Sequence, residues 1–296
     1  MWVYRSTRVK QSCSLLVCVL SVCITPAVSQ DYSKRSVTQL IDDLTQIDAQ
    51  APGIDSAAVY LGFIADDNPG SFVMGVLGVA PPTVPPQMLE LVRRGPLALP
   101  ELVKHLDDKR PTKLEVGNKD SDSSTHQVGV DYFWWTAFGE EYDPRLRHGL
   151  AEEESKSQPR KSDLPNWRNF QGRYTVRVGD VCYVLIGQIV NRHLLAVRYQ
   201  ASAGLVVNSP IETPALADQV RSDWGKADGE MLKASLLADI RVKNDQKGFD
   251  QARYAINPAL QRLRLYFPDT YNALQGDDLR KRKQFEEQET KRQAPQ

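Results

Sequence analysis

Four carboxylates flank a run of aromatic side chains and could carry out acid–base chemistry. Asp131 precedes the aromatic residues 132–135, and Glu140, Glu141 and Asp143 follow them. Paired carboxylates beside aromatic rings are typical of sugar-cleaving sites, where one acts as an acid and the other as a base or nucleophile. Alternatively, the rings pack in the core and the acids face solvent. The spacing in sequence does not fix the distance between carboxyl groups, so both interpretations of this acidic–aromatic segment stay open.

Cys182 is a second candidate for chemistry, with His193 as a possible base. A reactive thiol needs an electropositive and partly exposed setting. Cys182 instead lies beside Val181, Val184 and Leu185, and free cysteine is among the residues most often buried. We therefore predict that Cys182 belongs to the core.

No pattern predicts a metal or cofactor site. None of the four histidines, His105, His126, His148 and His193, forms an i, i+4 pair of the kind that binds zinc on a helix. Residues 120–123 alternate oxygen donors but lack the glycine and terminal glutamate of a calcium loop. The sequence also contains no phosphate-binding glycine loop, dinucleotide fingerprint or nucleophile elbow.

One polar cluster brackets a strongly apolar region, and we predict that it ties loops together by hydrogen bonds rather than lining a pocket. Its members are Arg192, Arg198, Tyr199, Asn208 and Ser209.

The first 29 residues have the features of a secretory signal peptide. Arg5, Arg8 and Lys10 precede an apolar run over 15–24, and small residues over 27–29 offer a cleavage site. The apolar run is shorter than the roughly 20 residues that span a bilayer, and no other run approaches that length. We expect a secreted or periplasmic protein cleaved after Ser29, with no integral membrane span.

Loss of this segment changes both the cysteine content and the charge. Three of the four cysteines lie within it, so Cys182 alone remains and no intramolecular disulfide is expected. Val22 stands where a lipobox needs a small residue, so lipid anchoring at Cys23 is not expected. The chain has 37 basic and 37 acidic side chains, and the segment removes three basic ones. The chain therefore has no excess of basic side chains to neutralise phosphates, which argues against nucleic-acid binding.

The elements that position these residues are predicted to be mainly helices. Apolar periodicity indicates a helix over 37–47 with Ser36 as N-cap and a helix over 181–190 with Asp180 as N-cap and Asn191 at the end. The same periodicity indicates helices over 56–65, 88–94, 101–106, 214–224, 230–240 and 258–266. A short strand is predicted around 173–178, and 194–207 supplies a strand pair or a buried helix. Residues 111–127 and 151–165 read as polar linkers, and 277–296 as a charged tail with a frayed, solvated helix.

Residues 88–107 resemble one HEAT-type repeat, with two helices joined by a Gly-containing turn and closed by Leu-Asp-Asp. Residues 178–181, which open the next helix, add weaker support. The chain is similar in this respect to exported bacterial proteins of unassigned function. The resemblance implies a solenoid-like stack of helical hairpins that holds partners, and it brings no functional residues with it.

The predicted organisation is a signal peptide (1–29), a HEAT-like helical region (36–110), a polar linker (111–127), a mainly helical C-terminal domain (128–276) and the tail. The first functional hypothesis is an exported interaction or scaffold protein without catalysis, which binds a protein in the cell envelope. The alternative is a secreted hydrolase or carbohydrate-binding protein that uses Asp131, Glu140, Glu141 and Asp143.

Overall fold

The helix α6 (Val178–Val190) lies in the core and contacts α2 (Pro86–Arg94), α3 (Leu99–Lys104), α8 (Gly229–Arg241) and β3 (Arg173–Arg177). Every one of its residues except Gln188 is buried, and a helix that is apolar on all sides needs neighbours on all sides. The computed structural model describes residues 31–49, 51, 62–65, 83–117, 133–134, 173–199, 205–242 and 255–293. Apart from Asp31, all of these belong to one compact unit, Tyr32–Gln296.

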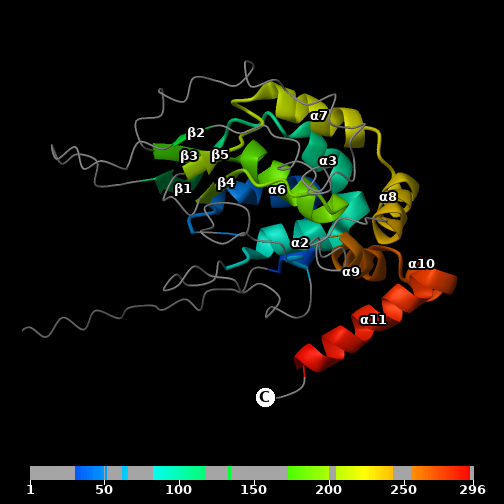
Figure 1. Ribbon diagram of the computed structural model, residues 1–296. Helices are drawn as coiled ribbons and strands as arrows, with labels where there is room; N and C mark the ends of the chain where they lie inside the picture. Colours follow the sequence, from blue (N-terminus) through cyan, green and yellow to red (C-terminus); the bar gives the residue numbers. More distant parts are fainter. Residues whose placement is uncertain are drawn as a thin grey trace, which may run out of the picture. The chain divides into compact units, whose positions relative to one another are not determined.

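The helices of the described residues come from both halves of the sequence (Figure 1). The N-terminal half supplies α1 (Val37–Asp43), α2 (Pro86–Arg94) and α3 (Leu99–Lys104), with the 3-10 turns η1 (Tyr32–Lys34), η2 (Leu44–Gln46) and η4 (Gly95–Leu97). The C-terminal half supplies α7 (Pro214–Trp224), α8 (Gly229–Arg241), α9 (Asn257–Tyr266), α10 (Pro268–Asn272) and α11 (Gly276–Gln293). The described residues are therefore mainly helical, as the sequence predicted.

Two small sheets accompany the helices. The strand β1 (Pro111–Gly117) pairs antiparallel with β3 (Arg173–Arg177). In the second sheet, β5 (Leu205–Val207) lies between β2 (Phe133–Trp134), to which it is parallel, and β4 (Val197–Tyr199), to which it is antiparallel. The strand predicted around 173–178 is confirmed, and of the two alternatives for 194–207 the strand pair is correct.

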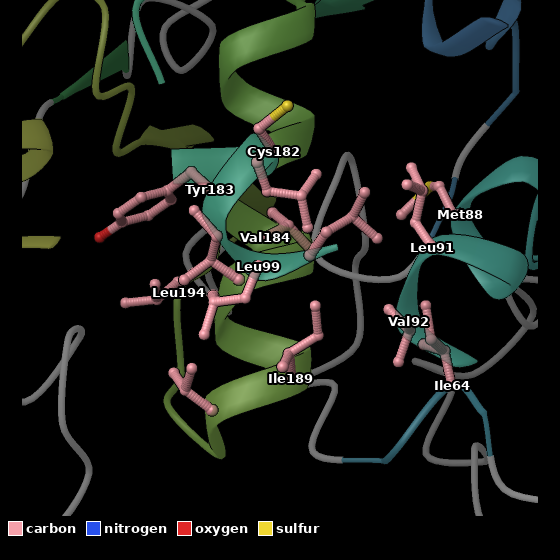
Figure 2. Close-up of a cluster of buried hydrophobic side chains, with 14 of the residues drawn as sticks. Ile64, Met88, Leu91, Val92, Leu99, Cys182, Tyr183, Val184, Ile189 and Leu194 are labelled. Carbon is pink, nitrogen blue, oxygen red and sulfur yellow. The ribbon is translucent and has the colours of Figure 1, made fainter. Parts of the chain in front are cut away.

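The core fills the space between α6 and its neighbours. Figure 2 shows Cys182 and Val184 of α6 beside Leu99 of α3. Met88 and Leu91 reach this cluster from α2, and all five side chains are at most 2% exposed. Burying each such side chain contributes about 1.5–3 kcal/mol.

Most predicted helices are confirmed, and their caps explain where they begin. Ser36 Oγ accepts a hydrogen bond from Gln39 N–H, and Gln39 Oε1 accepts one from Ser36 N–H, which makes a capping box at α1. Asn191 ends α6 in the left-handed conformation, with φ of 60°. Pro86, Pro214 and Pro258 occupy the first turns of their helices, where the missing N–H costs nothing.

Three local predictions are wrong. Asp180 is the third residue of α6 rather than its N-cap, which is Arg177. Residues 62–65 are bend and turn, not the end of a helix, and 56–61 lie outside the described residues. Residues 111–117 of the predicted linker form β1, because Leu114 and Val116 alternate into the core.

The predicted helix of the tail is present as α11, over 276–293, and it is anchored to its neighbours. Phe285 is 2% exposed, and Arg264 of α9 pairs with Glu289 at 2.6 Å. A buried ring and an ion pair from a neighbouring helix anchor α11, which sequence periodicity in a charged run does not reveal.

Candidate functional site

The acidic–aromatic segment cannot be placed as a site. Asp131, Glu140, Glu141 and Asp143 lie outside the described residues. Of the aromatic run, Phe133 and Trp134 form β2, next to β5. The sugar-processing site stays a prediction.

Cys182 is in the core, as predicted. Its side chain is fully buried in the first half of α6, and burial raises the pKa of the thiol. At 1.5 Å per residue, about 12 Å of helix separates Cys182 from Val190 at the end of α6, and His193 follows that end. The fold therefore does not present Cys182 and His193 as a nucleophile–base pair.

A buried carboxylic acid lies where α6 begins. Asp180 Oδ2 accepts hydrogen bonds from Tyr174 OH at 2.7 Å and from Arg177 N–H at 2.9 Å. Burial raises the pKa of Asp180, and hydrogen bonds from Ser209 and Tyr174 offset part of the rise. Burial, reinforced by the charge of Asp180, also raises the pKa of Tyr174.

The partners of Asp180 show what this cluster does. Ser209 Oγ accepts from Ile211 N–H at 3.2 Å and from Glu212 N–H at 3.3 Å, and the Arg177 guanidinium pairs with Glu212 at 2.5 Å. The cluster joins β3, α6 and the turn that leads to α7. We interpret it as a structural tie, which agrees with the role predicted for Ser209.

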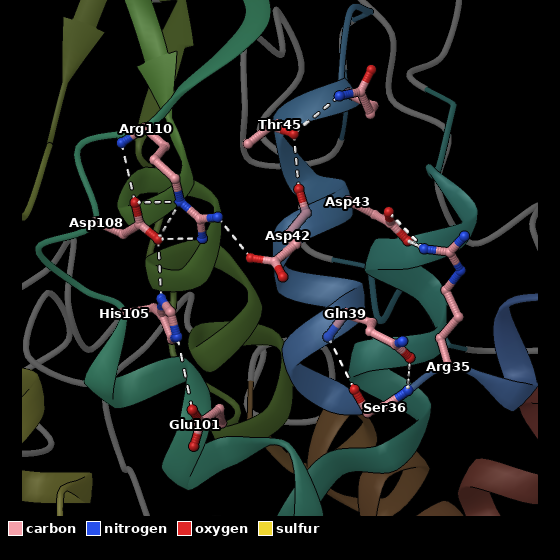
Figure 3. A network of polar contacts seen from close by, with 11 residues as sticks. Arg35, Ser36, Gln39, Asp42, Asp43, Thr45, Glu101, His105, Asp108 and Arg110 are labelled. Carbon is pink, nitrogen blue, oxygen red and sulfur yellow. Dashed lines mark hydrogen bonds and ion pairs between the residues drawn. The ribbon is translucent and has the colours of Figure 1, made fainter.

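A second polar network connects α1 with the loop after α3 (Figure 3). The Arg110 guanidinium donates hydrogen bonds to Asp108 and, through Nη1, to Asp42 Oδ1 at 2.6 Å. His105 Nδ1 lies 3.0 Å from Asp108 Oδ2. Burial opposes ionisation of Asp108, but hydrogen bonds from Arg110 and His105 outweigh it and lower its pKa to about 2. The same loop accepts the first N–H groups of α6, since Val178 N–H bonds Arg110 O and Gly179 N–H bonds Asp108 O.

A third polar group closes the other end of α6. Arg192 Nη1 donates to Asp239 Oδ2 of α8 at 2.8 Å, and the side chains of Arg192 and Asp239 are 7% and 1% exposed. Asn191 donates to the same oxygen at 2.9 Å. The prediction of a structural role is thus confirmed for Arg192, whereas the side chains of Arg198 and Tyr199 lie outside the described set.

Three large apolar side chains are exposed on elements that contact one another. The large apolar residues that the described part of the chain exposes are Leu97 (81%), Met231 (41%) and Leu265 (40%). They belong to η4, α8 and α9, and α8 packs against both η4 and α9. Our reading of the sequence missed this feature. The signal was available in α8, where 231–240 has more apolar positions than one buried face requires.

The described residues show neither a metal site nor a helix that could span a membrane. No three side chains of His, Cys, Asp or Glu come together there as a metal site would require. No helix in the same ranges has the length and apolar character needed to cross a bilayer.

No family model, curated protein or solved structure matches this chain.

Proposed function

We propose that the chain is an exported, mainly helical scaffold that binds another protein in the cell envelope and has no catalytic activity of its own. The observation that carries this proposal is the exposure of Leu97, Met231 and Leu265 on η4, α8 and α9. Leu97 is the most exposed of them, at the corner between α2 and α3. Exposed apolar side chains on adjacent elements favour binding of another protein surface.

The proposal extends to the architecture and the compartment. The two helices α2 and α3, which turn at Gly95, support a HEAT-like hairpin, the kind of unit that binds partners on its surface. Residues 1–29 support export, with cleavage after Ser29. Mass spectrometry of the native N-terminus tests the compartment: Gln30 as the first residue agrees with the proposal, and a lipidated Cys23 contradicts the cleavage site.

Cross-linking in the envelope fraction tests the binding function. A Leu97→Glu variant places a charge on the most exposed apolar side chain, so we expect it to lose the cross-linked partner that the unmodified protein captures. Ser222→Glu is the matched control, because Ser222 is exposed on α7 and lies outside the apolar group. Equal capture by the unmodified protein and the Leu97 variant would contradict the proposal.

A further inference from the structure

One face of α8 has an apolar centre and opposite charges at its two ends. The buried side of the helix carries Leu232, Leu236 and Ile240. The opposite side, here named the α8 face, is exposed except for half-buried Leu237. At 3.6 residues per turn its members fall within an arc of about 120°: Glu230, Met231, Ala234, Leu237, Ala238 and Arg241.

This arrangement differs from the solvent sides of α7 and α11. The solvent side of α7 carries Asp218 and Ser222, and that of α11 is charged along its length. The middle of the α8 face has no charged or hydroxyl side chain between Glu230 and Arg241. An exposed helix normally carries polar residues there, so this face is suited to contact with protein.

We propose that the α8 face binds the same face of a second copy of the chain, with the two helices antiparallel. The inference rests on the proposed function, because it names the protein that one part of the scaffold binds. A twofold axis is the common way for identical chains to associate, and it makes every contact occur twice.

Charge complementarity is the argument for a second copy in this orientation. Glu230 at the N-terminal end is 78% exposed, and Arg241 at the C-terminal end is 60% exposed. An antiparallel partner places each Glu230 opposite Arg241 of the other copy, whereas a parallel partner places like charges together. The antiparallel orientation also sets the helix dipoles against each other favourably.

The contacts within one chain are compatible with this pairing. Lys233 donates to Glu230 one turn away, and Arg241 donates to Asp278 through Nε. The small side chains of Ala234 and Ala238 permit helix axes about 8 Å apart, with Met231 and Leu237 packing beside the line of closest approach.

Sedimentation equilibrium over a range of protein concentrations tests the association. We expect the purified protein to dimerise and Ala234→Arg to weaken dimerisation by about tenfold or more, because it places a large cation at the centre of the interface. Ser222→Arg adds the same charge to an exposed position on α7 and is expected to dimerise normally. Circular dichroism confirms that each variant is folded. A monomeric unmodified protein at all concentrations, or a dimer unaffected by Ala234→Arg, would overturn the inference.

Exchanging the charges tests the orientation. Glu230→Arg and Arg241→Glu are each expected to weaken dimerisation, because each creates two like-charge contacts. An equimolar mixture of the two variants restores both opposite-charge contacts and is expected to dimerise as the unmodified protein does. Positions 230 and 241 are about 16 Å apart along one helix, too far for their side chains to pair within one chain. Restored dimerisation of the mixture therefore reports contacts between the two copies. A mixture that associates no better than its components overturns the antiparallel arrangement.

The two proposals fail separately. If the protein is monomeric but Leu97→Glu still loses its envelope partner, self-association is wrong and the binding function stands. If dimerisation follows the expected pattern but the envelope capture does not depend on Leu97, the scaffold binds only its own copies.

Discussion

Gly95 lies against the ring of Tyr266, and a Cβ added to the glycine would be 2.3 Å from Tyr266 Cε1. The glycine turns the chain between α2 and η4 with φ of +46°, a region that other residues rarely adopt. The ring cannot easily retreat, since Tyr266 OH donates to Val92 O at 2.7 Å and the ring forms a T-shaped pair with Phe63, with ring centroids 6.1 Å apart. This contact joins α9 to the corner that exposes Leu97.

Gly95→Ala is therefore expected to destabilise the protein by about 2–4 kcal/mol, through the positive φ and the overlap with the ring together. Urea unfolding followed by circular dichroism measures the change. Gly276→Ala is the matched control, because Gly276 also has a positive φ but its added Cβ meets no atom within 4 Å. A control that loses as much stability as Gly95→Ala would show that the ring contact contributes nothing.

Asp239→Asn is expected to cost about 3 kcal/mol, because it removes the carboxylate charge that pairs with the buried Arg192 guanidinium. Thermal unfolding of the two proteins gives the difference. Asp218→Asn removes an exposed carboxylate, 3.7 Å from Arg221 and 74% exposed, and is expected to change stability by less than about 0.5 kcal/mol. Similar losses in the two variants would mean that burial does not determine the value of the Arg192–Asp239 pair.

The sequence predicted the helices well because their signals are local. The periodic apolar residues of α2 and the left-handed stop at Asn191 act within a few residues of the elements they define. The strand β1 was missed although Leu114 and Val116 alternate within it, because its pairing with β3, more than fifty residues away, and the bond from Thr112 Oγ1 to Val176 O at 2.9 Å are not local. Such a partner does not appear in the local pattern of residues 111–117.

The polar ties were only partly predictable for the same reason. Ser209 and Arg192 were recognised as structural from their apolar surroundings. The partners of Ser209 and Arg192 were not predicted. Asp180 meets Ser209 only because α6 packs against the turn before α7, and Asp239 meets Arg192 only because α6 packs against α8. The α8 face was visible in the sequence as extra apolar positions, but only the packed structure shows which of those positions stay in contact with solvent.

Acid is expected to weaken the network around Asp108. Its pKa is lowered from 3.8 to about 2, so the folded state binds the proton less tightly than the unfolded state. The stabilisation is complete above about pH 4 and is lost as the pH falls toward 2. Because Arg110 is 42% exposed, solvent screening reduces the effect to about 1–2 kcal/mol.

Urea unfolding at pH 5 and at pH 2.5 measures this loss. Asp108→Asn carries no titrating group at this position and is expected to lose about 1 kcal/mol less than the unmodified protein over that interval. The same acid-induced loss in both proteins would assign it to other carboxylates.

Asp180 is expected to have the opposite pH dependence. Its pKa is raised by burial, so the folded state binds the proton more tightly than the unfolded state. As the pH falls from neutrality toward the ordinary aspartate range near 4, the stability of the unmodified protein should rise relative to that of Asp180→Asn, which does not titrate there. Unfolding free energies of the two proteins at pH 7, 5.5 and 4 give the trend. The unfolding free energy of the unmodified protein minus that of Asp180→Asn is expected to increase toward acid. If it stays constant or decreases, the hydrogen bonds from Tyr174, Ser209 and Arg177 N–H outweigh the burial of this carboxyl group.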